Sequence, residues 1–150
     1  MAEPVTIAVD AMGGDAGAGV CVPASIEFVR HQPGVRILLV GQHEVLGALA
    51  TTAGGLPAGI EIQDARQIVA MDERPADALR KKKDSSMRVA VDLVKSGKAN
   101  ACGSAGNTGA LMATGRFVLK TLPGIERPAI MAALPPGIRA ATRPVAAHDY

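Results

Sequence analysis

Aromatic residues are nearly absent from this sequence, which has no tryptophan, two phenylalanines and one tyrosine. Its core must therefore be built from aliphatic side chains, as is common in parallel α/β sheets. A basic run, Arg80 to Lys83, stands mid-chain, but no aromatic residue lies near it in the sequence. Because nucleic-acid binding usually combines basic patches with stacking rings, we expect no nucleic-acid partner.

Cysteine and long apolar runs are also scarce. Cys21 and Cys102 are the only cysteines and do not form a CxxC pair, which argues against a disulfide framework and for a reducing compartment. No run approaches the roughly 18 apolar residues of a spanning helix, and the N-terminus lacks the pattern of a signal peptide. No group of histidines, cysteines and carboxylates has metal-ligand spacing. We therefore expect a cytoplasmic protein that holds no metal.

Strand-like and helix-like segments alternate along the 150 residues. Short apolar runs predict strands at 5–9, 35–40 and 99–103, with weaker candidates at 60–62, 68–71 and 128–134. Helical spacing predicts five helices: one with Pro23 in its first turn and a stop at 33–34, then 44–53, 75–83, a helix capped by Asp84 or Ser85 that stops at Gly97, and 111–119. The alternation predicts a layered α/β domain with a mostly parallel sheet. We place this domain at 1–134, and 135–150 reads as an irregular tail.

Two glycine-rich turns follow predicted strands, at 10–15 (DAMGGD) and 104–109 (SAGNTG). Ligands of open α/β sheets bind at the carboxyl ends of the strands. The second turn opens a helix, whose free N–H groups and dipole favour an anion. On the residue pattern alone, these glycines could equally do no more than form tight strand-to-helix corners.

Standard catalytic and nucleotide motifs fit poorly. The segment 13–19 does not align with GxGxxG, and 96–99 lacks the first glycine and the Ser/Thr of a P-loop. The segment 102–106 (CGSAG) is a near miss for the GxSxG nucleophile elbow, with His31, His43 and His148 as the available bases. A serine hydrolase-like enzyme with a degenerate elbow is therefore one alternative. The basic run is compatible with a solvated helix end or with an acidic partner.

Longer segments carry a more specific signal. The stretches 9–15 (VDAMGGD), 71–87 (MDERPADALRKKKDSSM) and 104–112 (SAGNTGALM) resemble the signature segments of the bacterial phosphate acyltransferases of phospholipid synthesis, and 123–128 (PGIERP) is similar as well. The resemblance runs from about residue 5 to residue 134. It implies a Rossmann-like three-layer α/β/α fold akin to the phosphotransacetylases.

The resemblance also implies a reaction, in which a fatty acyl group passes from acyl carrier protein to inorganic phosphate and gives acyl phosphate. It further implies a homodimer, no redox cofactor and loose association with the inner membrane face. Members of the family are roughly twice as long, so the chain is expected to be a truncated N-terminal half that is inactive alone. A non-catalytic module that binds carrier protein is the remaining alternative.

Site residues follow from the same segments. Because phosphate is a nucleophile and a thioester is already activated, positioning and oxyanion stabilisation suffice, and we expect no covalent serine intermediate. The expected catalytic residues are Asp10, Lys83, Asn107 and Thr108. The expected substrate-binding residues are Gly13, Gly14, Asp15, Lys81, Lys82, Ser104, Gly106 and Gly109.

Overall fold

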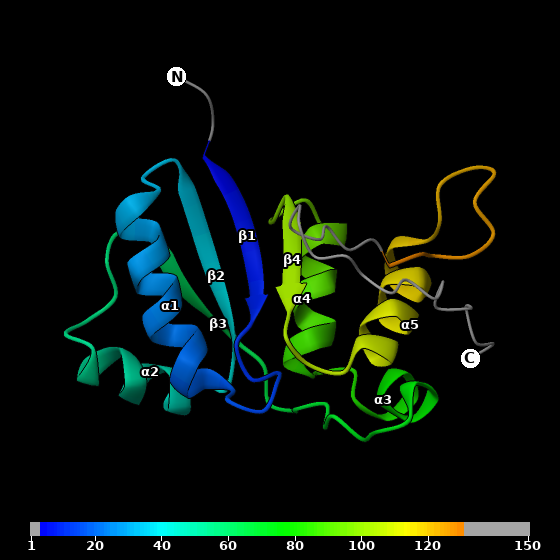
Figure 1. Cartoon of the computed structure of the whole chain (residues 1–150), viewed down its shortest axis with the longest axis horizontal. Helices are drawn as coiled ribbons and strands as arrows, with labels where there is room; N and C mark the ends of the chain where they lie inside the picture. Colours follow the sequence, from blue (N-terminus) through cyan, green and yellow to red (C-terminus); the bar gives the residue numbers. More distant parts are fainter. Residues whose placement is uncertain (1–3, 131–150) are drawn as a thin grey trace, which may run out of the picture.

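The computed structural model describes residues 4–130, and these residues form a single four-stranded sheet in which every strand pair is parallel (Figure 1). The strands lie in the order β3-β2-β1-β4. Their bounds are β1 Val5–Asp10, β2 Val35–Gly41, β3 Ile60–Asp64 and β4 Ala101–Ser104. The prediction of a mostly parallel sheet is confirmed.

Five helices connect or follow these strands within the described range: α1 Ala18–His31, α2 His43–Thr52, α3 Pro75–Lys81, α4 Ser86–Lys95 and α5 Thr108–Leu119. Helices α1 and α2 contact each other and strands β2 and β3, whereas α4 contacts β1, β2 and β4. Helix α5 packs against α3 and α4.

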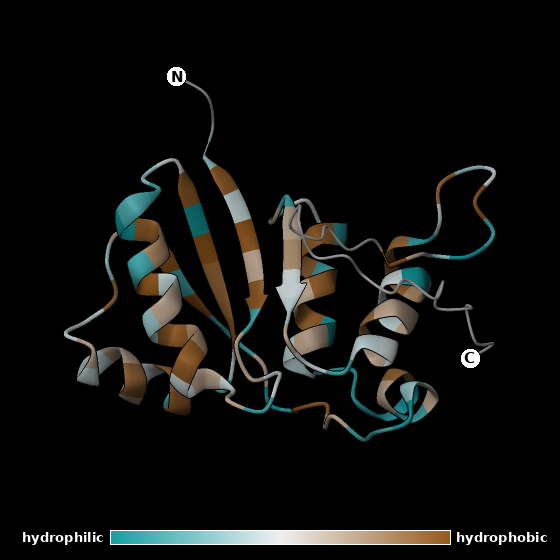
Figure 2. Ribbon diagram, in the orientation of Figure 1, coloured by the Kyte–Doolittle hydropathy of each residue, from teal (hydrophilic) through white to brown (hydrophobic). Residues whose placement is uncertain are grey.

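The central strand β2 shows why helices cover both faces of the sheet. Ile37 and Leu39 are buried with residues of α1 and α2, while Leu38 and Val40 pack with residues of α4. Successive side chains of a strand point to opposite faces, so a strand with apolar side chains on both faces must be covered twice. Figure 2 shows β2 as a largely hydrophobic ribbon. The predicted Rossmann-like three-layer α/β/α class is confirmed.

Helix α1 begins earlier than the sequence suggested. Pro23 lies inside the helix and not in its first turn, because α1 starts at Ala18. The carbonyl of Gly17 accepts from the amides of Val20 and Cys21 and so closes the first turn. Because proline has no N–H, one backbone hydrogen bond of α1 is missing at Pro23.

One of the weaker strand predictions fails, and another is tested only in part. Residues 68–71 form no strand, and only an isolated parallel bridge joins Gln67 to Ser85 nearby. Residues 128–130 are not a strand either, while 131–134 and the predicted tail 135–150 lie outside the described residues. The prediction that Ser85 caps a helix is confirmed, because its Oγ accepts from the amide of Arg88 at the start of α4.

Candidate functional site

The connections of the sheet identify one edge as the place for a site. From β1 the chain moves to β2 and β3 on one side, whereas β4 pairs with β1 on the other side. The strand order therefore reverses between β1 and β4. In open α/β sheets, ligands bind at the carboxyl ends of the strands at such a switch point. Asp10 and Ser104, the last residues of β1 and β4, are paired in register at this point.

Asp10 and Ser104 are joined directly. The Ser104 Oγ donates to Asp10 Oδ2 at 2.6 Å and accepts from the amide of Gly106 at 3.0 Å. The other carboxylate oxygen, Oδ1, accepts from the amide of Met12 at 3.3 Å. Asp10 is only 2% exposed. A buried carboxylate with this set of donors holds the two turns, 11–17 and 105–107, against each other.

Gly13 allows this close approach. A Cβ at position 13 would lie 2.7 Å from Asp10 Oδ2 and 3.0 Å from both Ser104 Oγ and the Gly106 nitrogen. Gly14 adopts φ +84° and lies against Ala105, whose carbonyl oxygen would be 3.0 Å from a Cβ there. Gly13 is buried, Gly14 is half-buried and Asp15 is exposed. The first glycine-rich turn is thus more than a corner, because two of its glycines lie at the contact with the second turn.

The second turn leads into α5. Asn107 is the N-cap of α5, and its Oδ1 accepts from the amide of Ala110 at 3.0 Å. Asn107 is buried, whereas Thr108 is exposed and Gly109 is half-buried. A Cβ at Gly109 would lie 3.0 Å from Cγ of Pro75, so the first turns of α5 and α3 are in contact. Thr108 is exposed at a helix end whose dipole favours negative charge.

Residues 68–84 form an excursion that we call the flap. It leaves the sheet after β3, contains α3 and returns to α4 (Figure 1). At its neck, the amide of Gln67 donates to the carbonyl of Asp84, and the amide of Ser86 donates to the carbonyl of Gln67. In Figure 1 the flap runs along the edge of the molecule toward which the strand arrows point. It therefore lies on the same side of the sheet as Asp10 and Ser104.

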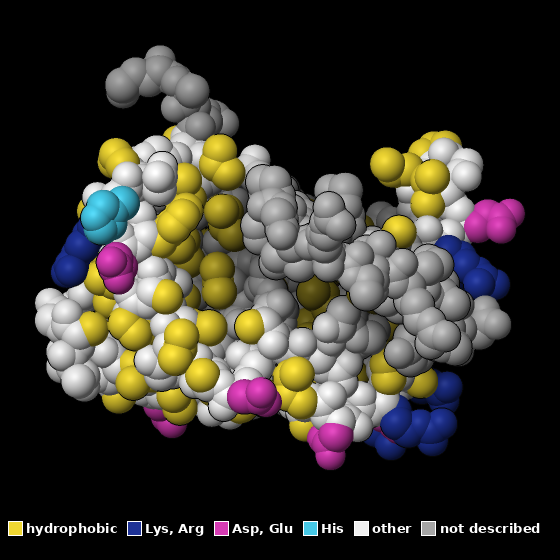
Figure 3. Space-filling model, in the orientation of Figure 1, with side chains coloured by type: hydrophobic (Ala, Val, Ile, Leu, Met, Phe, Trp, Pro, Cys, Tyr) yellow, Lys and Arg dark blue, Asp and Glu magenta, His cyan; other side chains and the backbone are white. Residues whose placement is uncertain are grey.

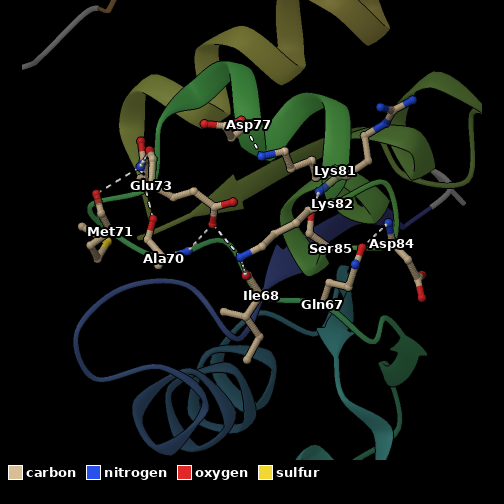
Figure 4. Close-up of polar contacts among 12 residues, drawn as sticks. Gln67, Ile68, Ala70, Met71, Glu73, Asp77, Lys81, Lys82, Asp84 and Ser85 are labelled. Carbon is tan, nitrogen blue, oxygen red and sulfur yellow. Dashed lines mark hydrogen bonds and ion pairs between the residues drawn. The ribbon is translucent and has the colours of Figure 1, made fainter.

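The predicted lysines lie at the end of α3 in the flap and differ in their surroundings. Lys82 Nζ is 2.6 Å from both the Glu73 carboxylate and the carbonyl oxygen of Ile68 (Figure 4). Lys81 pairs with Asp77 on an exposed surface, and Lys83 is exposed. Lys and Arg side chains gather over α3 in Figure 3. None of these three lysines is hydrogen-bonded to Asp10 or Ser104, so the predicted residues fall into two groups.

The two cysteines stay protonated near neutral pH. Burial raises the pKa of both Cys21 and Cys102 above 9.0, and the negative charge of Asp10 adds to the effect. Since the thiolate is the reactive form, neither thiol is a good nucleophile. Among residues 4–130, no group of histidine, cysteine and acidic residues could hold a metal ion.

This geometry gives little support to the nucleophile-elbow alternative. Ser104 donates its hydroxyl hydrogen to a carboxylate instead of to a histidine. His31 lies at the end of α1, where its Nδ1 is hydrogen-bonded to the carbonyl of Glu27, and His43 begins α2. His148 lies outside the described residues.

Sequence reasoning missed the contribution of Glu73 and the way in which Asn107 is used. Asn107 looked like a ligand-binding side chain because α5 was expected to begin at residue 111. An asparagine directly before a helix is a preferred N-cap, and this signal was available. Glu73 precedes α3 and Lys82 follows it, and no local sequence pattern predicts the ion pair between them.

Comparison with known proteins now adds to this geometry. A family model described as "Fatty acid synthesis protein" matches residues 5–141, a range that includes the whole switch-point site and the flap. The chain belongs to this family. Within residues 4–130, no helix is long and apolar enough to cross a membrane.

Curated relatives carry the name phosphate acyltransferase, which confirms the resemblance seen in the sequence. The protein from Chromobacterium violaceum is 61% identical over 132 residues, which cover 87% of this chain and 38% of that protein. The protein from Nitrosococcus oceani is 59% identical over 132 residues, with 87% and 39% covered. The one from Alkalilimnicola ehrlichii is 56% identical over 136 residues, with 90% and 40% covered. The chain thus spans about two fifths of the length of these relatives.

Proposed function

We propose that the full-length protein carrying these residues transfers a fatty acyl group from acyl carrier protein to inorganic phosphate, giving acyl phosphate for phospholipid synthesis. The observation that carries this proposal is the buried Asp10–Ser104 pair, which joins two glycine-rich turns at the switch point of the sheet. Such a point is where α/β sheets bind their ligands. The names of the relatives supply the chemistry.

The proposed reaction needs no covalent intermediate on the protein. An oxygen of hydrogen phosphate attacks the thioester carbonyl carbon and forms a tetrahedral oxyanion. The C–S bond then breaks, and the proton of the phosphate ends on the departing sulfur, which leaves as the thiol of the carrier protein. The protein has to place the two reactants together and stabilise the oxyanion.

The roles of the switch-point residues follow from their positions. The exposed Thr108 and the backbone amides of 107–109 are our candidates to bind phosphate or the oxyanion, because a helix N-terminus favours negative charge. The amide of Gly106 already donates to Ser104 Oγ. Gly13 and Gly14 let the first turn approach, and Asp15 is exposed beside it. Asp10 and Ser104 hold the turns in place. Asn107 is buried and holds the start of α5 through its bond to the Ala110 amide.

The flap is our candidate contact for acyl carrier protein, which is acidic. Arg80 and Lys83 form no ion pair with another residue of the range 4–130, and Lys81 is exposed, so these cations can attract a negative surface. Lys82 supports the flap from within. We further propose a cytoplasmic homodimer that associates loosely with the membrane face, and that the 150 residues alone are inactive.

The test is acyl phosphate formation by the full-length protein from acyl carrier protein thioester and phosphate. Arg80→Glu together with Lys83→Glu should raise the KM for acyl carrier protein at low salt, and added salt should raise the wild-type KM, because rim charges act on association. An unchanged KM for acyl carrier protein would show that the flap is not its docking surface. Binding of carrier protein without any acyl phosphate would favour the non-catalytic module, and an acylated Ser104 would favour the hydrolase-like alternative.

A further inference from the structure

Asn107 uses every polar atom of its side chain on the backbone. Its Nδ2 lies within hydrogen-bond distance of the carbonyl oxygens of Glu73 at 2.8 Å, Met71 at 3.0 Å and Ala70 at 3.2 Å, so that its two hydrogens are shared among three acceptors. Its Oδ1 accepts from Ala110 at the start of α5. The residue is 8% exposed. One side chain therefore ties the flap to the helix N-terminus to which we assign phosphate.

The flap has an internal brace as well. Glu73 Oε2 accepts from Lys82 Nζ and from the amide of Ala70, so the two ends of the flap meet across α3 (Figure 4). The side chains of Lys82 and Glu73 are 29% and 17% exposed. The brace at Glu73 and the hydrogen bonds at Gln67 both close the excursion on itself, so we treat the flap as one unit.

Besides Asn107, the flap is held to the rest of the molecule by the packing of α3 against α5. Val69 and Ala78 of the flap pack with Met87 and Ala110, a small apolar cluster beside α5. Pro75 touches Gly109. Asn107 adds a polar attachment to this packing, because its side chain lies outside the flap and donates to carbonyl groups of residues 70–73.

We propose that Asn107 is a positioning residue that latches the flap over the carboxyl edge of the sheet, and that release of this latch sets how well the acyl donor is held. The second half of this statement rests on the proposed function. Asn107 touches neither phosphate nor thioester. It acts by keeping residues 70–73 against the first turn of α5, so that a donor bound to the flap faces Thr108.

Two substitutions at position 107 separate the contacts with the flap from the N-cap of α5. Aspartate and serine are N-caps as good as asparagine, so Asn107→Asp and Asn107→Ser keep the bond to the Ala110 amide. An ionised aspartate has no donor and would repel the flap carbonyls, and serine has a single O–H on a shorter side chain, so it cannot replace the amide at all three carbonyls. Asn100→Asp is the matched control, because Asn100 uses only its Oδ1, which accepts from the Thr6 amide at 2.8 Å.

Amide hydrogen exchange on the full-length protein is the direct test. We expect amides of the flap, including those of Ala78 and Lys82, to exchange about tenfold faster or more in both Asn107 variants. Amides of α5 and of β1 should keep their wild-type protection, and Asn100→Asp should match wild type throughout. Flap exchange within twofold of wild type in Asn107→Ser would overturn the latch, whether or not the protein is an acyltransferase.

Kinetic measurements test whether the latch controls how well the acyl donor is held. If the closed flap is the form that holds the acyl donor, the KM for the donor should rise by the factor by which the closed population falls in the exchange data. Faster flap exchange with a KM that does not follow the closed population would overturn the control of donor binding and leave the latch. Absence of acyl phosphate formation by wild type would reject the proposed function but not the exchange result.

Discussion

Two strands of the sheet end in aspartate, and the two residues have different surroundings. Asp64 at the end of β3 is exposed, and its Oδ1 accepts from the amide of His43 at the start of α2. Asp10 at the end of β1 is buried and bonded to Ser104, which lies 94 positions away in the sequence. The residue type and strand position are the same. What differs is that β1 borders the switch point, so its last residue meets a second turn.

The same contrast recurs in glycine and lysine. Gly13 lies at the contact of two turns, whereas Gly47 in α2 has open space around its Cβ position. Lys82 is braced inside the flap, and its neighbour Lys81 lies on the surface. Each pair offers a substitution whose effect should depend on surroundings alone, and the predictions below run from the largest expected effect to the smallest.

Gly13→Ala should have the largest effect. The new methyl group would lie 2.7 Å from a buried carboxylate oxygen and 3.0 Å from a backbone nitrogen, and relief requires the two turns to separate. We expect a loss of about 1–3 kcal/mol in the free energy of unfolding. Urea denaturation of the full-length protein measures it. Gly47→Ala should instead change stability by no more than about 1 kcal/mol, in the stabilising direction, because alanine favours a helix; equal losses in both variants would contradict the contact.

Ser104→Ala should have a moderate effect on stability and should leave the reaction free of a covalent intermediate. It removes the 2.6 Å hydrogen bond from a carboxylate that is 2% exposed, which we expect to cost about 1–3 kcal/mol. Mass spectrometry of wild type quenched during turnover should find no acyl group on Ser104. An acylated Ser104, together with complete inactivity of a well-folded alanine variant, would contradict the positioning role.

Lys82→Met and Lys81→Met sharpen the comparison within two adjacent residues. Loss of Lys82 leaves the half-buried Glu73 carboxylate without its ammonium partner, so exchange of flap amides should quicken by about tenfold. Loss of Lys81 removes an exposed pair and should leave flap exchange unchanged. The prediction fails if the two variants behave alike.

The flap should also loosen in acid. The hydrogen bond from Lys82 holds the pKa of Glu73 below the ordinary 4.5, against the opposing effect of burial. A carboxyl group with a lowered pKa in the folded state stabilises that state above its unfolded pKa, and this contribution is lost as the pH falls through the folded value. Flap amides should therefore lose protection below about pH 4.5, after correction for intrinsic exchange. In Glu73→Gln this dependence should disappear.

The parts of the fold that could be predicted were those set by local pattern. Apolar runs indicated β1, β2 and β4, and the glycine-rich turns indicated the edge that carries the site. The contact between Asp10 and Ser104 could not be foreseen from periodicity, because it depends on which strands become neighbours. The switch point emerges only once β4 is known to pair with β1.

The flap shows the second limit of sequence reasoning. Residues 68–71 have a strand-like composition, yet the carbonyl groups of Ala70 and Met71 accept from the side chain of Asn107, and that of Ile68 accepts from Lys82, instead of from a neighbouring strand. When a side chain takes the place of a neighbouring strand as hydrogen-bond partner, the periodicity of the sequence does not reveal it. The basic run was foreseen as one surface, but the structure divides it, because Lys82 turns inward to Glu73.

The central claim is that the carboxyl edge between β1 and β4 is where the acyl group meets phosphate. The most direct measurement compares acyl phosphate formation by two full-length variants, Asp10→Asn and Asp64→Asn, each with a folded state verified by its exchange pattern. An asparagine at either strand end can still accept a hydrogen bond through Oδ1, so only the surroundings differ. Our account predicts that Asp10→Asn loses most of the activity and that Asp64→Asn keeps it. Wild-type activity in a folded Asp10→Asn variant would contradict the account.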